Sequence, residues 1–338
     1  MISPAKRDPR GRALATGLLA AAAAVAVAAS LLLGSRTVSP GDVADALLGV
    51  GGAEIRGIVW DLRVPRTLVA FAVGASLAVA GVLAQAWTRN PLADPGFIGI
   101  TAGASFTVAL GTAVGAAVGA GATAGLAFVG AAGAAGVVML VARRARSPLT
   151  LILVGVGVDA ALRSGAMLIG LFDTDVLDGM RHWTVGSTFG RGYGDAAVAW
   201  AGLGAGGVCA ALAARPLDLL ALGEETSLAL GGSPRLARAC AALGVVLLAG
   251  CATAAAGPVA FVGFAAPHVM RRVVGPQVRA LLLPTALFGG TMVLLADVAG
   301  RLILRPGELE MSVVLAFLGA PVLIAAVHRG VGWRRGVA

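Results

Sequence analysis

Uncharged apolar runs of about 20 residues recur along most of this 338-residue chain, and they constrain its fold more than any other feature. A run of that length, coiled as an α-helix, crosses the roughly 30 Å hydrocarbon core of a lipid bilayer. Only helices and closed barrels satisfy their backbone in lipid, and these runs lack the apolar–polar alternation of barrel strands. The sequence therefore predicts an all-α polytopic membrane protein.

Composition and charge agree with this fold class. The chain is 58% hydrophobic and 13% charged, whereas soluble domains are nearer a quarter charged. Its 50 glycines suit close contact between helices, because small residues let backbones approach. The net charge of +9 lies mainly in the connections between apolar runs, which favours a membrane topology over nucleic-acid binding.

We predict about ten membrane-spanning helices in a single domain, residues 1–338, behind a short N-terminal tail, residues 1–12. The predicted spans are residues 13–33, 66–87, 98–117, 121–142, 149–171, 195–214, 236–254, 258–274, 279–299 and 310–328. Basic residues are most frequent in the connections on the side of the tail, so the positive-inside rule places both termini in the cytoplasm. On the outer side, Ser39 and Pro40 are typical of the start of a short helix.

No enzymatic, metal or nucleotide site is predicted. The cysteines (Cys209, Cys240 and Cys251) lie inside apolar runs without metal-ligand spacing, which indicates buried apolar side chains. Lys6 is the only lysine, so a phosphate-binding loop of the GxxxxGK[ST] type cannot exist. If ATP drives this protein, another subunit binds it.

One charged pair stands inside a predicted span. Asp159 and Arg163 are four residues apart, on one helix face, where they can pair. Charges at membrane depth face protein or water rather than lipid. Either the two neutralise each other in helix packing, or their helix lines a wet translocation path and meets a polar substrate.

Residues 215–235 contain a short amphipathic helix outside the membrane, from Glu224 to Leu230, ended by two glycines. It presents leucines beside an acidic pair, Glu224 and Glu225. Such a helix is either a plain connector or a docking element for a cytoplasmic partner.

Several longer motifs follow one another along the chain: "LRVPRTLVAFAVGASLAVAGVLAQAWTRNPLADPGFIGITAGA" (62–104), "HWTVGS" (182–187), "LALGEETSLALGGS" (220–233), "AGPVAFVGFAAPHVMRRVVG" (256–275), "LLADVAGRL" (294–302) and "ELEMSVVLAFLGAP" (308–321). In this order and spacing, they resemble the FecCD-type permease subunits of ABC importers for iron–siderophores, haem and cobalamin. The chain departs from that pattern at Glu310–Ser312, where the family commonly has a proline, an apolar residue and a glycine.

The resemblance implies a type II ABC importer permease fold in the inner membrane of a bacterium. It implies no cofactor in this chain, because two partner ATPase subunits use the ATP and Mg. The other implied partners are a second permease, identical or paralogous, an extracytoplasmic substrate-binding protein, and the bilayer. Ferric siderophores are the commonest cargo of the family.

The resemblance also assigns residues. The coupling segment, about 222–232, is implied to seat in the ATPase; its residues are Leu222, Gly223, Glu224, Glu225, Leu228, Leu230 and Gly231. Three external arginines are implied to bind carboxylates of the binding protein: Arg63, Arg66 and Arg301. By themselves, the three would be read only as exposed, solvated charges. A pathway or gate is implied for Ser147, Pro148, Leu149 and Thr150, together with Asp159 and Arg163.

The segment "TRNPLADPGFIGI" (88–100) resembles a family signature between the second and third spans. Pro91 and Pro95 prevent either helix from continuing, Asn90 can tie the loop together, and Arg89 adds an inside charge. We expect a rigid cytoplasmic corner that shapes the ATPase side and does not touch substrate.

An alternative function is a secondary transporter driven by an ion gradient. It needs acids near the membrane midplane, for which Asp159 and Asp297 are the candidates.

Overall fold

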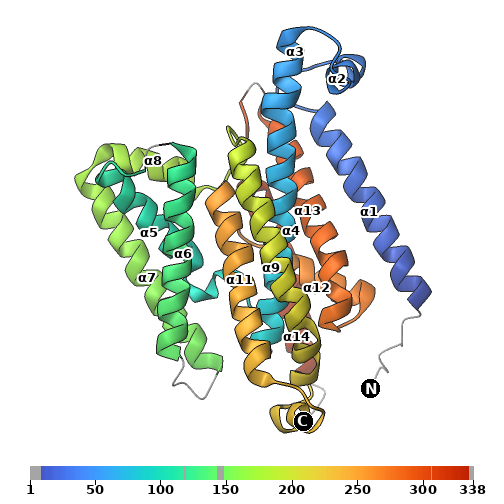
Figure 1. The fold of residues 1–338 in the computed structure, drawn as a ribbon, viewed down its shortest axis with the longest axis vertical. Coiled ribbons are helices and arrows are strands. Elements are labelled where there is room, and N and C mark those ends of the chain that lie inside the picture. Colours follow the sequence, from blue (N-terminus) through green and yellow to red (C-terminus); the bar gives the residue numbers. More distant parts are fainter. Residues whose placement is uncertain (1–8, 118, 143–147, 306, 335–338) are drawn as a thin grey trace.

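The computed structural model describes residues 9–117, 119–142, 148–305 and 307–334. Within these ranges the regular structure is helical and contains no strand. The helices form an elongated bundle (Figure 1). The membrane helices are α1 (Pro9–Leu32), α4 (Val64–Thr88), α5 (Ile100–Ala113), α6 (Ala120–Ala142), α7 (Pro148–Phe172), α9 (Tyr193–Leu220), α11 (Pro234–Ala256), α12 (Val262–Val274), α13 (Val278–Ile303) and α14 (Met311–Arg334).

Each predicted span overlaps one of these helices, which confirms the polytopic all-α class. Among the described residues, 7 helices are long and apolar enough to cross a membrane, by length and composition. Helix α5 has 14 residues and α12 has 13, so each is too short to span alone. Both begin inside the bundle, after irregular segments at residues 89–99 and 257–261. The count of about ten is therefore approximate.

The remaining helices are short, and all but one lie at the two ends of the bundle. They are α2 (Pro40–Leu47), α3 (Ala53–Gly57), the π-helix η1 (Ile58–Arg63), the 3₁₀ turn η2 (Pro95–Ile98), α8 (Thr174–Thr184) and α10 (Glu224–Ala229). Of these, only η2 lies within the bundle. Ser39 caps α2 by accepting a hydrogen bond from the backbone N–H of Asp42, and Pro40 begins the helix, as its sequence predicted.

Helix α4 is the central helix and packs against α9, α11, α12 and α13. Small residues let it approach its neighbours closely. At Gly81 there is no room for a side chain, because a Cβ there would overlap the carbonyl of Gly263 on α12. The abundance of glycine in the sequence is explained by such backbone contacts.

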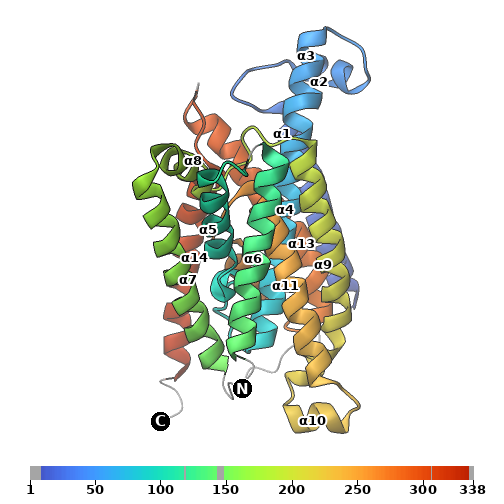
Figure 2. The ribbon, with the colours of Figure 1, turned by 60° about the vertical axis from the view of Figure 1, so that its left-hand side comes forward.

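Helix α4 also extends well beyond the bundle. With α3 and η1 it forms one continuous helical stretch of 36 residues, Ala53–Thr88. At about 1.5 Å per residue, this is near 54 Å, much longer than a bilayer core of about 30 Å. Its first turns, with α2, project above the other helices in Figures 1 and 2.

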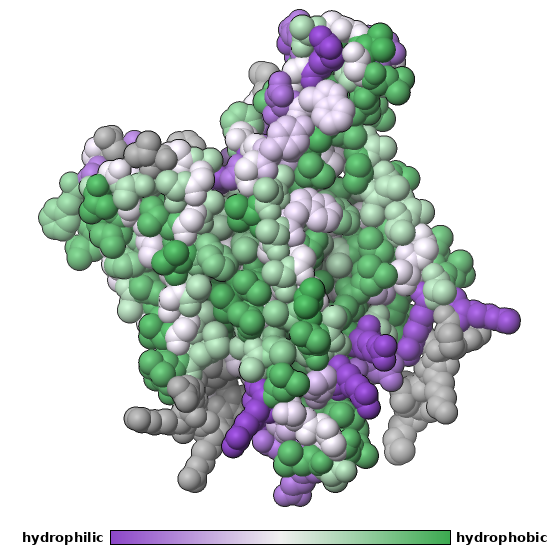
Figure 3. Space-filling view, viewed as in Figure 1, coloured by the Kyte–Doolittle hydropathy of each residue, from purple (hydrophilic) through white to green (hydrophobic). Residues whose placement is uncertain are grey.

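We call this the α2–α3 end and the opposite one the α10 end. Helix α1 begins and α14 ends at the α10 end (Figures 1 and 2). Between the two ends runs a broad apolar band, and the most hydrophilic residues gather above and below it (Figure 3). This distribution is that of a protein that sits across a bilayer.

Helices α5, α6, α7 and α8 pack on one another as a group at the side of α11 (Figure 1). The connections that follow α8 and α11 meet beside this group, where Ser187 donates its backbone N–H to the carbonyl of Ala256 at 2.8 Å. This arrangement leaves room for a cavity between the group and the rest of the bundle.

Candidate functional site

The central cavity, as we call it, has a volume of about 540 Å³. Its wall is formed by η2, α5, α7, the connections 185–192 and 257–261, and the start of α14. In a chain this apolar, its polar lining is unusual. The polar side chains in the wall include Asp94, Thr101, Ser105, Asp159, Arg163 and Thr184.

The predicted ion pair is part of this wall. Arg163 Nε lies 2.6 Å from Asp159 Oδ2, along one face of α7. The side chain of Arg163 is 57% exposed and that of Asp159 is 28% exposed, so the pair faces an accessible space rather than a packed helix interface. The two charges thus neutralise each other and also line a cavity.

The predicted gate lies at the start of the same helix. Ser147 is outside the described residues, and so are the side chains of Pro148 and Leu149. Pro148 begins α7, and Thr150 is exposed.

Residues 88–100 begin at the α10 end, as expected. Arg89 ends α4 in a left-handed conformation, with φ 51°. Its Nη2 donates a hydrogen bond of 2.6 Å to the carbonyl of Leu220, the last residue of α9. Asn90 ties the loop together, since its Oδ1 accepts from the backbone N–H of Leu92 at 2.9 Å. This half of the segment is a corner next to the coupling segment.

The other half returns into the bundle. The ring of Pro95 lies where a Cβ on Gly263 would be, on α12. The carbonyl of Phe97 lies against Gly155 of α7 so closely that a Cβ there would overlap it. Asp94 fixes the turn by accepting the backbone N–H of Gly96 at 2.9 Å.

The expectation that the whole segment stays at one end is thus wrong for residues 94–98. Asp94, Gly96 and Phe97 line the central cavity, whereas Arg89, Asn90 and Pro91, which form the corner, do not. The physical reason is that small residues on α7 and α12 open a space into which the loop folds back. One segment therefore joins the α10 end to the cavity wall.

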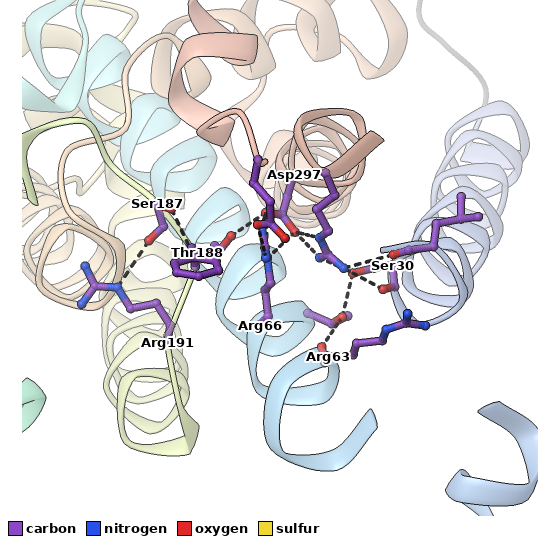
Figure 4. A network of polar contacts seen from close by, with 12 residues as sticks. Ser30, Arg63, Arg66, Ser187, Thr188, Arg191 and Asp297 are labelled. Atoms are coloured by element: carbon purple, nitrogen blue, oxygen red, sulfur yellow. Dashed lines mark hydrogen bonds and ion pairs between the residues drawn. The ribbon is translucent and has the colours of Figure 1, made fainter. Parts of the chain in front are cut away.

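The three predicted docking arginines form a network at the α2–α3 end (Figure 4). Its centre is Asp297 of α13, which is 1% exposed. Arg66 binds this carboxylate through Nε and Nη2, and Arg301 binds it from one turn along α13. Thr188 donates its hydroxyl to the same carboxylate.

Two of these arginines are not the exposed charges that the sequence alone indicated, whereas Arg66 is partly buried. Arg63 is 5% exposed and Arg301 is 2% exposed. Arg63 Nη1 donates to the carbonyls of Leu31 and Leu32, at 2.7 and 3.1 Å, and Arg301 Nη1 donates to that of Ser30 at 2.9 Å. These carbonyls belong to the last turn of α1, where a helix leaves its acceptors unsatisfied and carries partial negative charge. The two arginines therefore cap α1.

Even so, these arginines border an accessible space, which we call the arginine pocket. It is a cavity of about 320 Å³, and its charged lining consists of Arg36, Arg63, Arg66, Arg191, Arg301, Asp61 and Glu308. Burial lowers the pKa of Arg191, an effect that the nearby Asp195 carboxylate partly offsets. Five arginines and two carboxylates line the pocket, and further carboxylates pair with these arginines from outside the lining (Asp297, Asp195 and Glu54). The pocket therefore offers guanidinium donors to an anion rather than a large excess of positive charge.

At the other end, α10 forms where the sequence predicts it. Gly223 and Gly231, on either side of it, have φ angles of 109° and 74°, which favour glycine. Ser227 is buried, whereas Leu222, Leu228 and Leu230 are 61%, 58% and 57% exposed. Leucines exposed together at the polar end of a membrane protein are typical of an interaction surface.

An ion pair ties α10 to α11. Arg238 Nη2 lies 2.6 Å from Glu224 Oε2. The hydrogen bond from Arg238 holds the pKa of the Glu224 carboxyl below its ordinary value. Glu225, its neighbour, is exposed.

Some residues of these sites were missed in the sequence. Glu308 and Thr188 join the arginine network from positions more than 100 residues away from Arg66, and no spacing relates them. The one available signal was Asp297, which is four residues before Arg301 on a helix. The three cysteines are free, and the described residues contain no group of metal-ligating side chains.

Comparison with known proteins adds to this geometry. Residues 22–329 match the model of the FecCD transport family. The chain is 39% identical to the ferric enterobactin transport system permease protein FepD of Escherichia coli, over 94% of this chain and 96% of that protein. It is 36% identical to the probable siderophore transport system permease protein YfiZ of Bacillus subtilis, over 90% and 92% of the two chains.

A solved structure described as an inward-facing conformation of a metal-chelate type ABC transporter is also similar. It superposes with a TM-score of 0.82 at 26% identity, covering 93% of this chain and 98% of that one. The family model covers nearly the whole chain, and the relatives and the solved structure agree with it from end to end. The resemblance inferred from the motifs is therefore confirmed, and this chain belongs to the FecCD transport family.

Proposed function

We propose that this chain is the membrane-spanning permease subunit of a binding-protein-dependent ABC importer for ferric siderophores, in the inner membrane of a bacterium. The observation that carries the proposal is the central cavity, a polar-lined space inside an otherwise apolar bundle. A path for a polar cargo requires such a space. The siderophore assignment is supported by the names of the two relatives reported above.

The α10 end faces the cytoplasm in this proposal. Basic residues cluster there, as the positive-inside rule expects of a cytoplasmic side. The basic residues of the described helices at this end include Arg89, Arg215, Arg235, Arg238, Arg271 and Arg272. Both termini then lie in the cytoplasm.

The exposed leucines of α10 dock into a partner ATPase subunit, and two such subunits bind and hydrolyse ATP with Mg. Helix α10 packs against α9 and α11 through its buried side, which includes Ser227, so that a displacement of the leucines is passed to α9 and α11. This chain contributes no nucleotide site of its own, which agrees with the lack of a phosphate-binding loop in its sequence.

The arginine pocket faces outward and receives an acidic side chain of the substrate-binding protein. Arg63 and Arg301 cap α1 and shape the pocket, which leaves Arg66 as the most accessible of the three predicted docking arginines, with 12% of its side chain exposed. Charge-assisted contacts of this kind suit a complex that forms specifically and releases.

A second permease copy or paralogue covers the open side of the central cavity. An apolar groove of about 620 Å³ runs along α14, and Val185 and Ser312 line both this groove and the central cavity. Phe317 in the groove is 77% exposed. A partner seated there encloses the path between the two subunits.

Transport then proceeds by alternating access. The ATPases bind the two conformations of the permease with different affinity, because a partner that binds both equally shifts nothing. The ion-gradient alternative is not favoured by any observation. Of its two candidate acids, Asp297 is held by Arg66 and Arg301 and Asp159 by Arg163, so each is already neutralised.

The test is uptake of a ferric siderophore carrying radiolabelled iron, in a strain that lacks this gene and is then complemented. We expect complemented cells to take up the label and cells with an ATPase partner inactivated to take up none. Equal uptake with and without the gene refutes the proposed cargo.

A further inference from the structure

The arginine pocket contains its own carboxylate. Glu308, in the connection between α13 and α14, accepts a hydrogen bond of 2.7 Å from Arg66 Nη1. Its side chain is 18% exposed, whereas that of Asp297, the other acidic partner of Arg66, is 1% exposed. Water and a docking protein can therefore reach Glu308 but not Asp297.

The other contacts of the arginines are fixed by the fold. Arg63 donates to carbonyls of α1 and to that of Arg36, and Arg301 donates to α1 and to buried Asp297. Removing these partners uncaps a helix or leaves a charge buried without a partner, and both changes are strongly destabilising. An incoming anion thus cannot take those positions.

Glu308 is different, because its backbone is held independently of its side chain. The next residue, Leu309, donates its backbone N–H to the carbonyl of Gly300 at 3.0 Å, and that carbonyl belongs to α13. The carboxylate can leave Arg66 by rotation of its side chain while this backbone contact stays in place. Among the described partners of Arg66, it is the one that can be exchanged.

We propose that Glu308 occupies the position of the docking partner's carboxylate, and that docking exchanges one for the other at Arg66 Nη1. The inference rests on the proposed function, in which a substrate-binding protein presents an acidic side chain to this pocket. Exchange makes the contact specific yet weak. The net gain in binding free energy at Arg66 is only the difference between two similar charge-assisted hydrogen bonds.

Phe189 restricts the direction from which a carboxylate can approach Arg66. Its ring centroid lies 6.0 Å from Arg66 Cζ, and its side chain is 67% exposed at the rim of the pocket. The ring covers one side of the guanidinium, so a carboxylate approaches Arg66 from the side where Glu308 now lies.

The test is the affinity of the complete permease–ATPase complex, in lipid nanodiscs, for the siderophore-binding protein encoded in the same operon. Glu308→Gln keeps the size of the side chain and removes its charge, so the competitor for Arg66 is weakened. We expect the dissociation constant to fall roughly threefold to tenfold, because a neutral acceptor binds a guanidinium less strongly than a carboxylate does.

The matched control is Glu310→Gln, which removes the same charge two residues away. No ion pair is described for Glu310 in the part of the chain that the structure covers, so this variant reports any general effect of charge at the outer face. We expect its dissociation constant to stay within about twofold of the wild type. The gain in affinity from Glu308→Gln should also vanish in the double variant that carries Arg66→Gln as well.

Every result of this binding experiment supports or overturns the inference. Weaker binding by Glu308→Gln overturns the inference, because Glu308 would then contact the partner itself. Unchanged binding, or an equal gain from Glu310→Gln, also overturns it and leaves the proposed function intact. A wild-type complex that does not bind the protein at all refutes instead the proposed docking.

Discussion

Arg89 Nη2 donates a hydrogen bond of 2.6 Å to the carbonyl of Leu220, so the loop after α4 is fastened to the residue that ends α9. Four residues beyond Leu220 the coupling helix α10 begins, and five residues beyond Arg89 the chain enters the wall of the central cavity at Asp94. The two ends of the transport machinery proposed above are thus joined by one short segment.

Arg89→Gln should therefore uncouple the importer. The hydrogen bond to Leu220 is partly buried, and a glutamine cannot supply the same donor at the same reach. We expect the complex to hydrolyse ATP at a near-normal rate while the number of siderophores imported per ATP falls severalfold. The measurement is transport and hydrolysis in the same proteoliposomes.

Arg238→Gln is the matched control for Arg89. This variant removes another arginine at the α10 end. The ion pair of Arg238 with Glu224 is exposed, however, since 44% of the Arg238 side chain and 53% of the Glu224 side chain are accessible. Water screens an exposed ion pair, which therefore contributes little to stability, so coupling should change little. Equal losses in both variants contradict a special role for Arg89.

The Glu224–Arg238 pair makes one prediction about pH. The pKa of Glu224 is lowered in the folded protein, so its contribution to stability is present above the ordinary carboxyl pKa and is lost as pH falls through the lowered value. Acidification should therefore loosen α10 in the wild type and not in Glu224→Gln. Hydrogen exchange of the α10 amides measures this loosening as a function of pH. The same pH response in both proteins contradicts the prediction.

The Asp159–Arg163 pair is predicted to act on cargo as well as on packing. Exchanging the two, in Asp159→Arg with Arg163→Asp, keeps an i,i+4 ion pair on α7 and reverses its direction in the cavity wall. We expect thermal stability close to wild type and clearly reduced uptake. Full uptake by the exchanged protein would mean that the two charges only neutralise each other and do not act on the cargo.

Docking of the ATPase should depend on the leucines of α10. Leu228→Glu places a charge in the middle of the exposed apolar surface, where its desolvation opposes binding. We expect the ATPase subunits to be lost on copurification. Leu48→Glu, at the α2–α3 end, changes a leucine that is 79% exposed and should leave them bound. Retention of the ATPase by Leu228→Glu removes α10 from the interface.

Close packing at the centre of the bundle predicts a contrast between two glycines. Gly81→Ala places a methyl group against the carbonyl of Gly263 and should destabilise the protein by about 1–3 kcal/mol. Gly133→Ala, on α6, meets nothing within 4 Å and should be neutral or slightly stabilising. Thermal unfolding in one detergent compares them, and equal midpoints contradict the packing described here.

The sequence predicted what depends on local pattern. Length and hydrophobicity located every membrane helix, and Ser39 and the glycines around α10 marked short helices correctly, because caps and turns are determined by neighbouring residues. The Asp159–Arg163 pair could be predicted from the sequence for the same reason, since the two residues are four apart on one helix.

What the sequence could not predict depends on contacts between distant segments. Arg63 and Arg301 resemble surface charges until α1 is brought beside them, 31 and 271 residues away. The return of Asp94–Phe97 into the bundle depends on the space left by Gly155 and Gly263 on two other helices. Hydropathy does not distinguish such a loop from an ordinary turn.

The most direct test of the account is import by purified components in proteoliposomes: this chain, its permease partner, the ATPase subunits and the binding protein. A ferric siderophore is placed on the binding-protein side and ATP on the α10 side, with the proton gradient collapsed by an uncoupler. The account predicts ATP-dependent accumulation that the uncoupler leaves unchanged. Accumulation that requires the gradient and continues without ATP would contradict it.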